Sequence, residues 1–206
     1  MGLGLSLHIF WKRNLDDKVN DKDSELIYKV QDGDTNAFRT LVDLYKDKSL
    51  SLAISIVKNE SLAEDILQDS FIKVYRNIKW FKYKSKFSTW LYKIIVNTSY
   101  NELKRQKKNI SIEESDFVTN LSIKKEENPV LRLEDQKKYI QKAMELLKTD
   151  EALVLRLFYL CEMSLKEIAI ITKFSASKVR VDLHRGRKNI KQQLEQLLGE
   201  EINHLL

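Results

Sequence analysis

Hydrophobic residues recur three and four positions apart along most of the chain, which is the spacing of one face of an α-helix. A short helix from Ser24 to Val30 is predicted first, followed by a turn at Asp32-Gly33-Asp34. One proline and five glycines in the whole chain are fewer than turn-rich β architectures need. The pattern therefore predicts an all-α protein. The next, longer helix is predicted from its apolar positions, Phe38, Leu41, Val42, Tyr45, Leu52, Ile56 and Val57.

The following helix is predicted to begin after a break at Asn59-Glu60-Ser61. Ser61 would be its N-cap, and Glu64 three residues later would complete a capping box. The helix is predicted to end near Ile78. Its predicted buried positions are Leu62, Ile66, Phe71 and Val74.

Residues 79–86 are rich in lysine and aromatic residues and show no clean period, so they predict a loop. Ser88 is predicted to cap a helix that covers 89–107. Its predicted inward face consists of Leu91, Ile94, Ile95 and Thr98, with Trp90, Lys93, Asn97 and Lys104 on a more polar side.

Periodicity is lost over 109–129, where acidic residues, Ser and Asn accumulate and Pro129 closes the stretch. This stretch predicts a flexible acidic linker between two small helical domains, 24–108 and 130–206, after an N-terminal extension over 1–23. The apolar run at the start of that extension is too short for a membrane span. Helices of the second domain are predicted over 130–147, 150–160, 165–171 and 175–198.

Charge is distributed unevenly along the chain. The formal net charge is only +6, but residues 71–108 carry eleven basic residues against one acidic residue. Residues 163–193 carry eight basic residues against two, whereas 109–135 carries three against seven. Two basic blocks on either side of an acidic spacer indicate two modules that bind a polyanion such as nucleic acid.

The second basic block predicts a helix-turn-helix. Ser164 and Glu167 form a capping box for a short helix, and Ser175 would cap the second helix. Gly186 lies on the predicted buried side of that helix, where it would permit close helix approach. The second helix would enter the major groove of DNA, although a solvated basic face remains the alternative. The candidate DNA-binding residues are Ser177, Lys178, Arg180, His184, Arg185, Arg187 and Lys188.

The first basic block interleaves aromatic residues with lysines, a combination typical of single-stranded nucleic-acid binding. Trp80, Phe81 and Tyr83 favour ligand contact because they lie in the predicted loop. For Phe87 and Trp90, core packing is equally compatible with the pattern. The cationic candidates are Lys79, Lys82, Lys84, Lys86 and Lys93.

An acidic segment, 60–69, contains Asp65, Gln68 and Asp69 at helical spacings of three and four residues. Either a protein-binding face or a solvated helix surface would produce this pattern. The single cysteine, Cys161, follows an apolar run and predicts a buried thiol. We find no phosphate loop, no metal-ligand spacing around His184 and no nucleophile beside a base, so we expect no cofactor, metal, small-molecule substrate or catalytic activity.

Taken in order, three segments make the chain resemble the extracytoplasmic-function (ECF) group of bacterial sigma factors. Residues 63–78 read AEDILQDSFIKVYRNI and resemble the polymerase-binding stretch of that group. Residues 87–105 read FSTWLYKIIVNTSYNELKR and resemble the helix that engages the minus-ten promoter element. Residues 167–190 read EIAIITKFSASKVRVDLHRGRKNI and resemble the helix-turn-helix that reads the minus-thirty-five element.

The resemblance implies a cytoplasmic initiation factor whose partners are core RNA polymerase, promoter DNA and, as in related proteins, an anti-sigma factor that can be membrane-anchored. It implies that Asp65, Gln68 and Asp69 dock on polymerase. The loop of residues 79–87 and Asn97 would meet the minus-ten strand, and the basic helix would meet the minus-thirty-five duplex. Two rival interpretations remain open at this point, a stand-alone helix-turn-helix regulator and a DNA-processing enzyme such as a recombinase.

The turn of the helix-turn-helix departs from the family pattern, which usually has an apolar residue followed by glycine. Thr172 and Lys173 stand there instead. A lysine in the left-handed conformation costs roughly 1 kcal/mol, so the sequence alone does not predict the geometry of this turn. In the family, the two residues before the buried valine of the second helix usually end in Thr. Here these two residues are Ser177 and Lys178.

Overall fold

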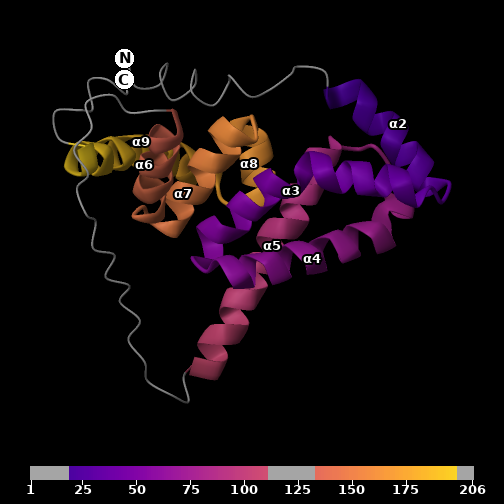
Figure 1. The fold of residues 1–206 in the computed structure, drawn as a ribbon, viewed down its shortest axis with the longest axis horizontal. Helices are drawn as coiled ribbons and strands as arrows, with labels where there is room; N and C mark the ends of the chain where they lie inside the picture. The colour runs from indigo at the N-terminus through magenta and orange to yellow at the C-terminus, as the bar shows by residue number, and fades with distance from the viewer. Residues whose placement is uncertain (1–18, 111–132, 199–206) are drawn as a thin grey trace.

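The computed structural model describes residues 19–110 and 133–198, and these residues form helices joined by short connections (Figure 1). They contain no strand, so the predicted all-α class is confirmed for the described part of the chain. The predicted linker falls largely on 111–132, which lies outside the described residues, as do 1–18 and 199–206.

The first domain consists of α2 (Val19–Gln31), α3 (Thr35–Val57), α4 (Glu60–Asn77), a 3-10 turn η1 (Ile78–Trp80) and α5 (Phe87–Ile110). Helix α2 begins at Val19, so the predicted domain start at 24 lies inside it. The predicted turn before α3 is present, with Gly33 at a φ of 104°. Asp34 caps α3 because its Oδ1 accepts hydrogen bonds from the backbone N–H groups of Asn36 and Ala37 at 2.8 and 3.1 Å.

Two predicted N-caps are wrong. Helix α4 is capped by Asn59, whose Oδ1 accepts from the backbone N–H of Leu62 at 2.9 Å, rather than by Ser61. This happens because Lys58, at a φ of 55°, ends α3 and leaves Asn59 extended, as a cap requires. Helix α5 already includes Ser88, because the Lys86 carbonyl accepts the backbone N–H of Trp90.

The second domain consists of α6 (Leu133–Glu145), α7 (Thr149–Leu155), a π-helical turn η2 (Arg156–Leu160), α8 (Leu165–Thr172) and α9 (Ala176–Leu198). Gly186 permits the predicted close approach, because a Cβ there would lie 3.0 Å from the Leu155 side chain. Cys161 is buried as predicted, and this burial raises the pKa of its thiol to about 12.

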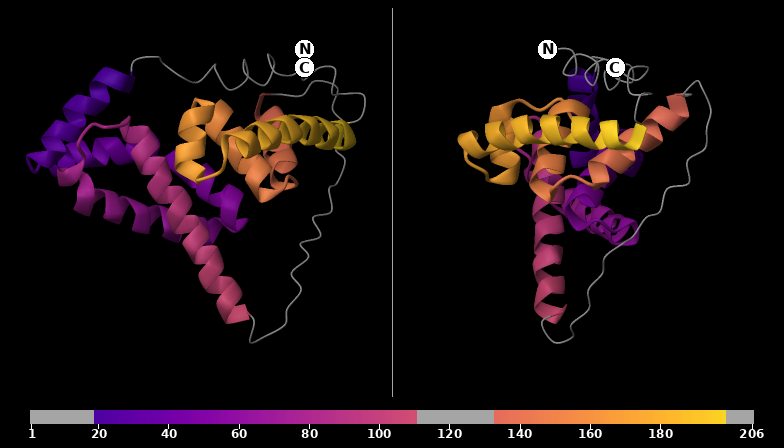
Figure 2. Two further views of the ribbon diagram at one scale, coloured as in Figure 1. Left: turned by 180° about the vertical axis from the view of Figure 1, so that it is seen from behind. Right: turned by 90° about the vertical axis from the view of Figure 1, so that its left-hand side faces the viewer.

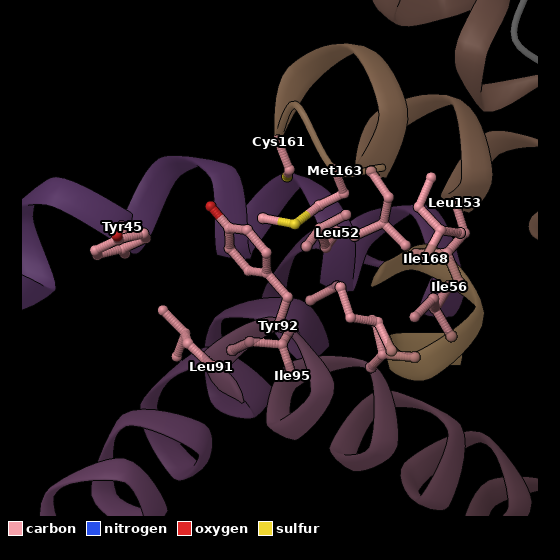
Figure 3. Close-up of a cluster of buried hydrophobic side chains, with 14 of the residues drawn as sticks. Tyr45, Leu52, Ile56, Leu91, Tyr92, Ile95, Leu153, Cys161, Met163 and Ile168 are labelled. Carbon is pink, nitrogen blue, oxygen red and sulfur yellow. The ribbon is translucent and has the colours of Figure 1, made fainter. Parts of the chain in front are cut away.

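The two domains pack against each other. Figures 1 and 2 show α6–α9 beside α3 and the first part of α5, while the C-terminal part of α5 extends away from the other helices. Tyr92 of α5 is almost fully buried and lies close to Cys161 and Met163 of the second domain (Figure 3). The two predicted helical domains therefore share one continuous hydrophobic core. Figure 3 also labels Tyr45, Leu52, Ile56, Leu91, Ile95, Leu153 and Ile168 in this cluster.

Polar contacts surround this shared core. Lys58 donates from Nζ to the Glu145 carbonyl at the end of α6, at 2.9 Å. Thr89 on α5 donates to the Glu167 carboxylate at 3.3 Å, and Lys86 approaches the same oxygen at 3.5 Å. Charged and hydroxyl groups thus border the apolar contact, as is typical of interfaces between domains.

Arg156 is a charged interface residue whose burial costs free energy. It is 5% exposed, and its Nε donates to Ser51 Oγ of α3 at 2.9 Å. Its Nη1 has no hydrogen-bond partner among the described residues. Burial disfavours the charged form and lowers the pKa of the guanidinium to about 10. A buried cation with an unmet donor opposes tight docking, so the interface combines apolar attraction with a polar penalty.

We predict that Glu167→Gln lowers the free energy of unfolding by about 1 kcal/mol at pH 7, because it removes the charge that Ser164 stabilises within α8 and that Lys86 and Thr89 stabilise across the interface. Burial alone would raise the pKa of Glu167, but its hydrogen bonds and Lys86 outweigh this effect and lower it. The charged form therefore stabilises the fold above the ordinary glutamate pKa, and this stability is lost as the pH falls.

Urea denaturation measured between pH 3 and 7 checks this expectation. The difference between wild type and Glu167→Gln should shrink steadily below about pH 4.5, where the unfolded chain also becomes protonated. Glu64→Gln, at an exposed position of α4, is the control and should show no such trend. A difference that stays constant down to pH 3 would contradict the assigned role of the charge.

Candidate nucleic-acid interface

The loop between η1 and α5 separates its aromatic residues into exposed and buried sets. Trp80 is 76% exposed and Tyr83 is 49% exposed, as expected for side chains that contact a ligand. Phe81 is only 8% exposed, so its ring does not lie on the surface of the loop in this structure, and its predicted DNA contact stays a prediction. The centroid of its ring lies 5.2 Å from that of the Trp90 ring and 5.9 Å from that of the Phe87 ring. Phe81 and Phe87 therefore belong to the hydrophobic core beneath the loop.

A pocket of about 410 Å³ lies between α4, η1 and α5. Trp80 and Trp90 line it, together with Lys73, Asn77 and Ile94. Aromatic residues beside an ammonium and an amide offer stacking, charge and hydrogen bonding in one place, which is what an unpaired nucleobase requires. The sequence analysis missed Lys73 and Asn77, although their spacing of four residues places them on one face of α4.

The polar residues of this pocket are held by hydrogen bonds within the protein. Asn77 donates from Nδ2 to the Lys73 carbonyl at 2.7 Å, and Lys73 donates from Nζ to Thr98 Oγ1 of α5 at 3.2 Å. Lys93 and Asn97 are half-buried on α5. Around the loop, Lys79, Lys82, Lys84 and Lys86 are exposed, so the predicted basic surface is present.

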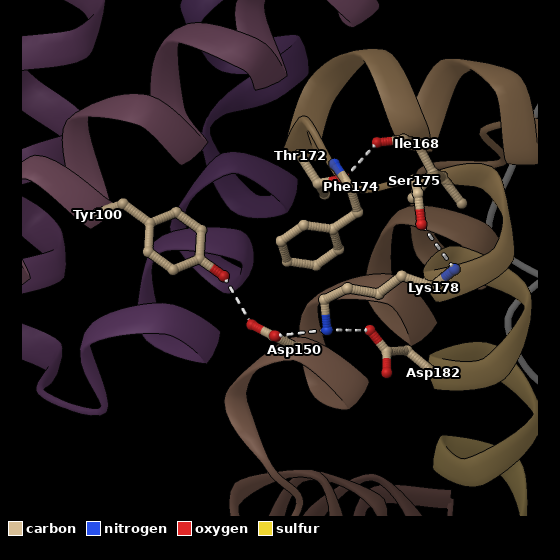
Figure 4. A network of polar contacts seen from close by, with 8 residues as sticks. All are labelled: Tyr100, Asp150, Ile168, Thr172, Phe174, Ser175, Lys178 and Asp182. Atoms are coloured by element: carbon tan, nitrogen blue, oxygen red, sulfur yellow. Dashed lines mark hydrogen bonds and ion pairs between the residues drawn. The ribbon is translucent and has the colours of Figure 1, made fainter.

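The helix-turn-helix has the predicted capping. Ser164 and Glu167 form the capping box of α8, and Ser175 Oγ accepts from the backbone N–H of Lys178 at 3.2 Å. Lys173 adopts the left-handed conformation, with a φ of 61°. Thr172 compensates for the absent glycine, because its Oγ1 donates to the Ile168 carbonyl at 2.7 Å and accepts from the backbone N–H of Phe174 at 3.2 Å (Figure 4).

Two of the predicted DNA-binding cations already have partners inside the protein. Lys178 bridges Asp150 at 2.8 Å and Asp182 at 2.7 Å (Figure 4), and Asp150 also accepts from Tyr100 of α5. Burial opposes the charge on Lys178, but the two aspartates outweigh it and raise its pKa. Arg187 donates to the Tyr159 hydroxyl at 2.7 Å. Arg187 is nevertheless exposed, as are the other predicted residues of this helix, namely Ser177, Arg180, His184, Arg185 and Lys188.

The acidic face of α4 is exposed as a unit. Asp65, Gln68 and Asp69 are all exposed. Ile72, one turn further along the same side, is an exposed hydrophobic residue that the sequence analysis did not single out. An apolar side chain beside acidic and amide groups is typical of a protein-binding surface.

Other kinds of site were not found in the described part of the chain. No group of three or more His, Cys, Asp or Glu residues there could hold a metal ion. None of the described helices combines the length and the apolar character that a membrane span requires.

These features define a helical DNA-binding protein, and comparison with known proteins gives its family. Residues 41–109 match the family model of Sigma-70 region 2, and residues 137–190 match that of Sigma-70, region 4. The chain is 33% identical over 180 residues to ECF RNA polymerase sigma factor SigW of Bacillus subtilis, covering 83% of this chain and 96% of SigW. It is 32% identical over 184 residues to ECF RNA polymerase sigma-E factor of Escherichia coli, covering 85% and 96%.

Solved structures show the same fold. The sigma factor RpoE of Bartonella quintana, in complex with the anti-sigma factor NepR, matches with a TM-score of 0.63 and 21% identity, over 77% of this chain and 96% of that one. CnrH, in complex with the cytosolic domain of CnrY, matches with a TM-score of 0.57 and 18% identity, over 85% and 98%.

The chain belongs to the ECF group of the sigma-70 family, so it directs promoter-specific initiation by RNA polymerase. The stand-alone regulator is not favoured, because the matches cover both domains rather than the helix-turn-helix alone.

We predict that Lys173→Gly stabilises the second domain by about 0.5–1 kcal/mol, because glycine adopts the left-handed conformation without the cost that lysine carries. Chemical denaturation of the full chain measures the change. Lys166→Gly is the control, since Lys166 is exposed in the first turn of α8, and it should instead destabilise, by up to about 1 kcal/mol. Equal destabilisation by both variants would show that the turn at Lys173 is not strained.

Proposed function

We propose that three surfaces of this sigma factor divide the work of initiation. The pocket between Trp80 and Trp90 takes an unpaired base of the minus-ten strand, and the exposed side of α9 contacts the minus-thirty-five duplex. The acidic face of α4 docks on core RNA polymerase. Residues 24–108 thus act as region 2 and residues 130–206 as region 4. The pocket lined by two tryptophans and one lysine is the observation that carries the proposal.

The energy of strand capture supports this assignment. Unstacking a base costs a few kcal/mol. Stacking one base on an aromatic side chain returns about 1–3 kcal/mol. Two indole rings that face one pocket can therefore offset the opening of a base step, while the nearby ammonium of Lys73 favours a strand that carries phosphates.

The start of α9 is suited to a major groove, because Ala176 and Ser177 are small and exposed. Arg180, His184, Arg185 and Lys188 would hold phosphates or base edges. Lys178 would reach DNA only after leaving Asp150 and Asp182, and Arg187 would keep its contact with Tyr159. The direct duplex contacts therefore centre on Ser177, Arg180, His184, Arg185 and Lys188, with the exposed Arg187 beside them.

On polymerase, we propose that Ile72 adds an apolar contact beside Asp65, Gln68 and Asp69. The sigma factor would supply no chemistry of its own and would act in the bacterial cytoplasm. RpoE of Bartonella quintana is bound to the anti-sigma factor NepR in its solved structure, which supports such a partner for this chain, either soluble or held at the inner membrane.

Run-off transcription on a promoter library tests the whole assignment. Core polymerase of the source organism is used with and without the protein, whose folding is checked by circular dichroism. New start sites that share two separated upstream elements are expected. Start sites that share a single element would contradict the proposed use of both DNA-binding surfaces.

For one such promoter, we predict that Trp80→Ala reduces the open complex by about tenfold, since one base stack is worth about 1–3 kcal/mol. Permanganate reactivity of thymines in the minus-ten element measures opening. Tyr28→Ala, which removes an aromatic side chain exposed on α2, is the control and should leave reactivity unchanged. Unchanged reactivity in Trp80→Ala would show that the pocket does not hold the strand.

A further inference from the structure

Building on this proposed function, we infer that Gln31 is a positioning residue for strand capture. Gln31 is the last residue of α2, outside the three segments that resemble the family. Its side chain holds the loop that carries Trp80 and Tyr83 in one conformation before DNA arrives. Gln31 is not among the residues that line the pocket, so it would act through the loop rather than on the base.

One amide group makes three contacts with the loop segment. Gln31 Nε2 donates to the carbonyl of Ile78 at 2.9 Å and to the carbonyl of Phe81 at 3.1 Å. Gln31 Oε1 accepts from the Tyr83 hydroxyl at 3.3 Å. Both donors and the acceptor of the side chain are thus used on residues about fifty positions away in the sequence.

The two carbonyls that Gln31 binds lie on either side of Trp80. The turn Ile78–Trp80 is a single 3-10 turn, closed by the hydrogen bond from the Phe81 N–H to the Ile78 carbonyl at 3.0 Å. Carbonyls at the end of so short a turn have few backbone partners. Gln31, from a different helix, gives the Ile78 carbonyl a second hydrogen bond and also binds the Phe81 carbonyl, so the backbone that carries the exposed indole of Trp80 is fixed at both ends.

Tyr83 shows that the loop is held against its local preference. Its φ is 55°, in the left-handed region that costs a residue other than glycine roughly 1 kcal/mol. The Tyr83 ring packs 5.1 Å from that of Phe81, and its hydroxyl is held by Gln31. A strained residue persists only where its surroundings determine its conformation, and such residues gather at functional sites.

Gln31 is itself rigidly placed. Its helix neighbours Ile27 and Val30 are buried in the core. Directly after it, the turn at Gly33 ends α2, with hydrogen bonds from the Gly33 N–H to the Val30 carbonyl at 3.0 Å and from the Asp34 N–H to the Lys29 carbonyl at 2.9 Å. The amide therefore projects from a fixed helix end, as a positioning group must.

Ordering the loop in advance lowers the cost of binding. If the loop becomes ordered only when the strand binds, the loss of conformational entropy makes the binding free energy less favourable. Loss of the Gln31 contacts should therefore weaken strand capture without changing the polymerase-binding face of α4 or the exposed side of α9.

The test compares variants of the full chain in two measurements. Gln31→Leu keeps the size of the side chain but removes all three contacts. Gln31→Lys can still donate to the two carbonyls but cannot accept from Tyr83. Glu25→Gln, which removes an exposed ion pair on the same helix, is the matched control.

The first measurement is amide hydrogen exchange of residues 79–86 in the free protein. Exchange should be about tenfold faster in Gln31→Leu, partly restored in Gln31→Lys and unchanged in Glu25→Gln. Unchanged exchange in Gln31→Leu would overturn the inference, whatever the protein does in transcription.

The second measurement uses holoenzyme on a promoter found by run-off transcription, with 2-aminopurine fluorescence in the minus-ten strand. Gln31→Leu should reduce opening about tenfold, with partial rescue in Gln31→Lys, while affinities for core polymerase and for upstream duplex stay unchanged. Wild-type opening in Gln31→Leu, or an equal loss of all three activities, would overturn the positioning role. Failure of the wild-type holoenzyme to open any promoter would instead overturn the proposed function, and this inference with it.

Discussion

Helix α5 packs on both halves of the molecule, and the placement of the other functional elements depends on that packing. Leu91, Tyr92 and Ile95 are buried between α3 on one side and the second domain on the other. Because these residues face inward, Trp90 is left at the rim, where it forms one wall of the pocket. The same burial that stabilises the fold thus orients the surface proposed to capture the promoter strand.

The contact between the domains has an apolar centre, and at its edge lies a buried charged group that costs free energy. Tyr92 is buried beside Cys161, whereas Arg156 remains charged in a buried position with an unmet donor. Lys178 connects this interface to the recognition helix, because the Asp150 carboxylate that holds it also accepts from Tyr100 of α5. DNA phosphates would therefore compete with Asp150 and Asp182 for the Lys178 ammonium, and Asp150 also contacts the neighbouring domain through Tyr100.

The sequence predicted the helices, the helix-turn-helix capping and the exposure of Trp80, because periodicity and caps depend on residues close together in the chain. It did not predict the burial of Phe81, which depends on tertiary packing against Phe87 and Trp90. Residue periodicity also did not predict that the domains share a core. The hydrophobic pattern of α5 would be the same whether helices of its own domain or of the other domain covered its buried face. Gln31 was missed because its partners lie about fifty residues away.

Site-specific photo-crosslinking tests the division of labour most directly. A crosslinking amino acid is placed at residue 80 or at residue 177 in holoenzyme bound to one promoter. We expect residue 80 to label the non-template strand of the minus-ten element and residue 177 to label duplex DNA of the minus-thirty-five element. Labelling of a single element from both positions, or labelling of DNA from residue 177 alone, would contradict the account.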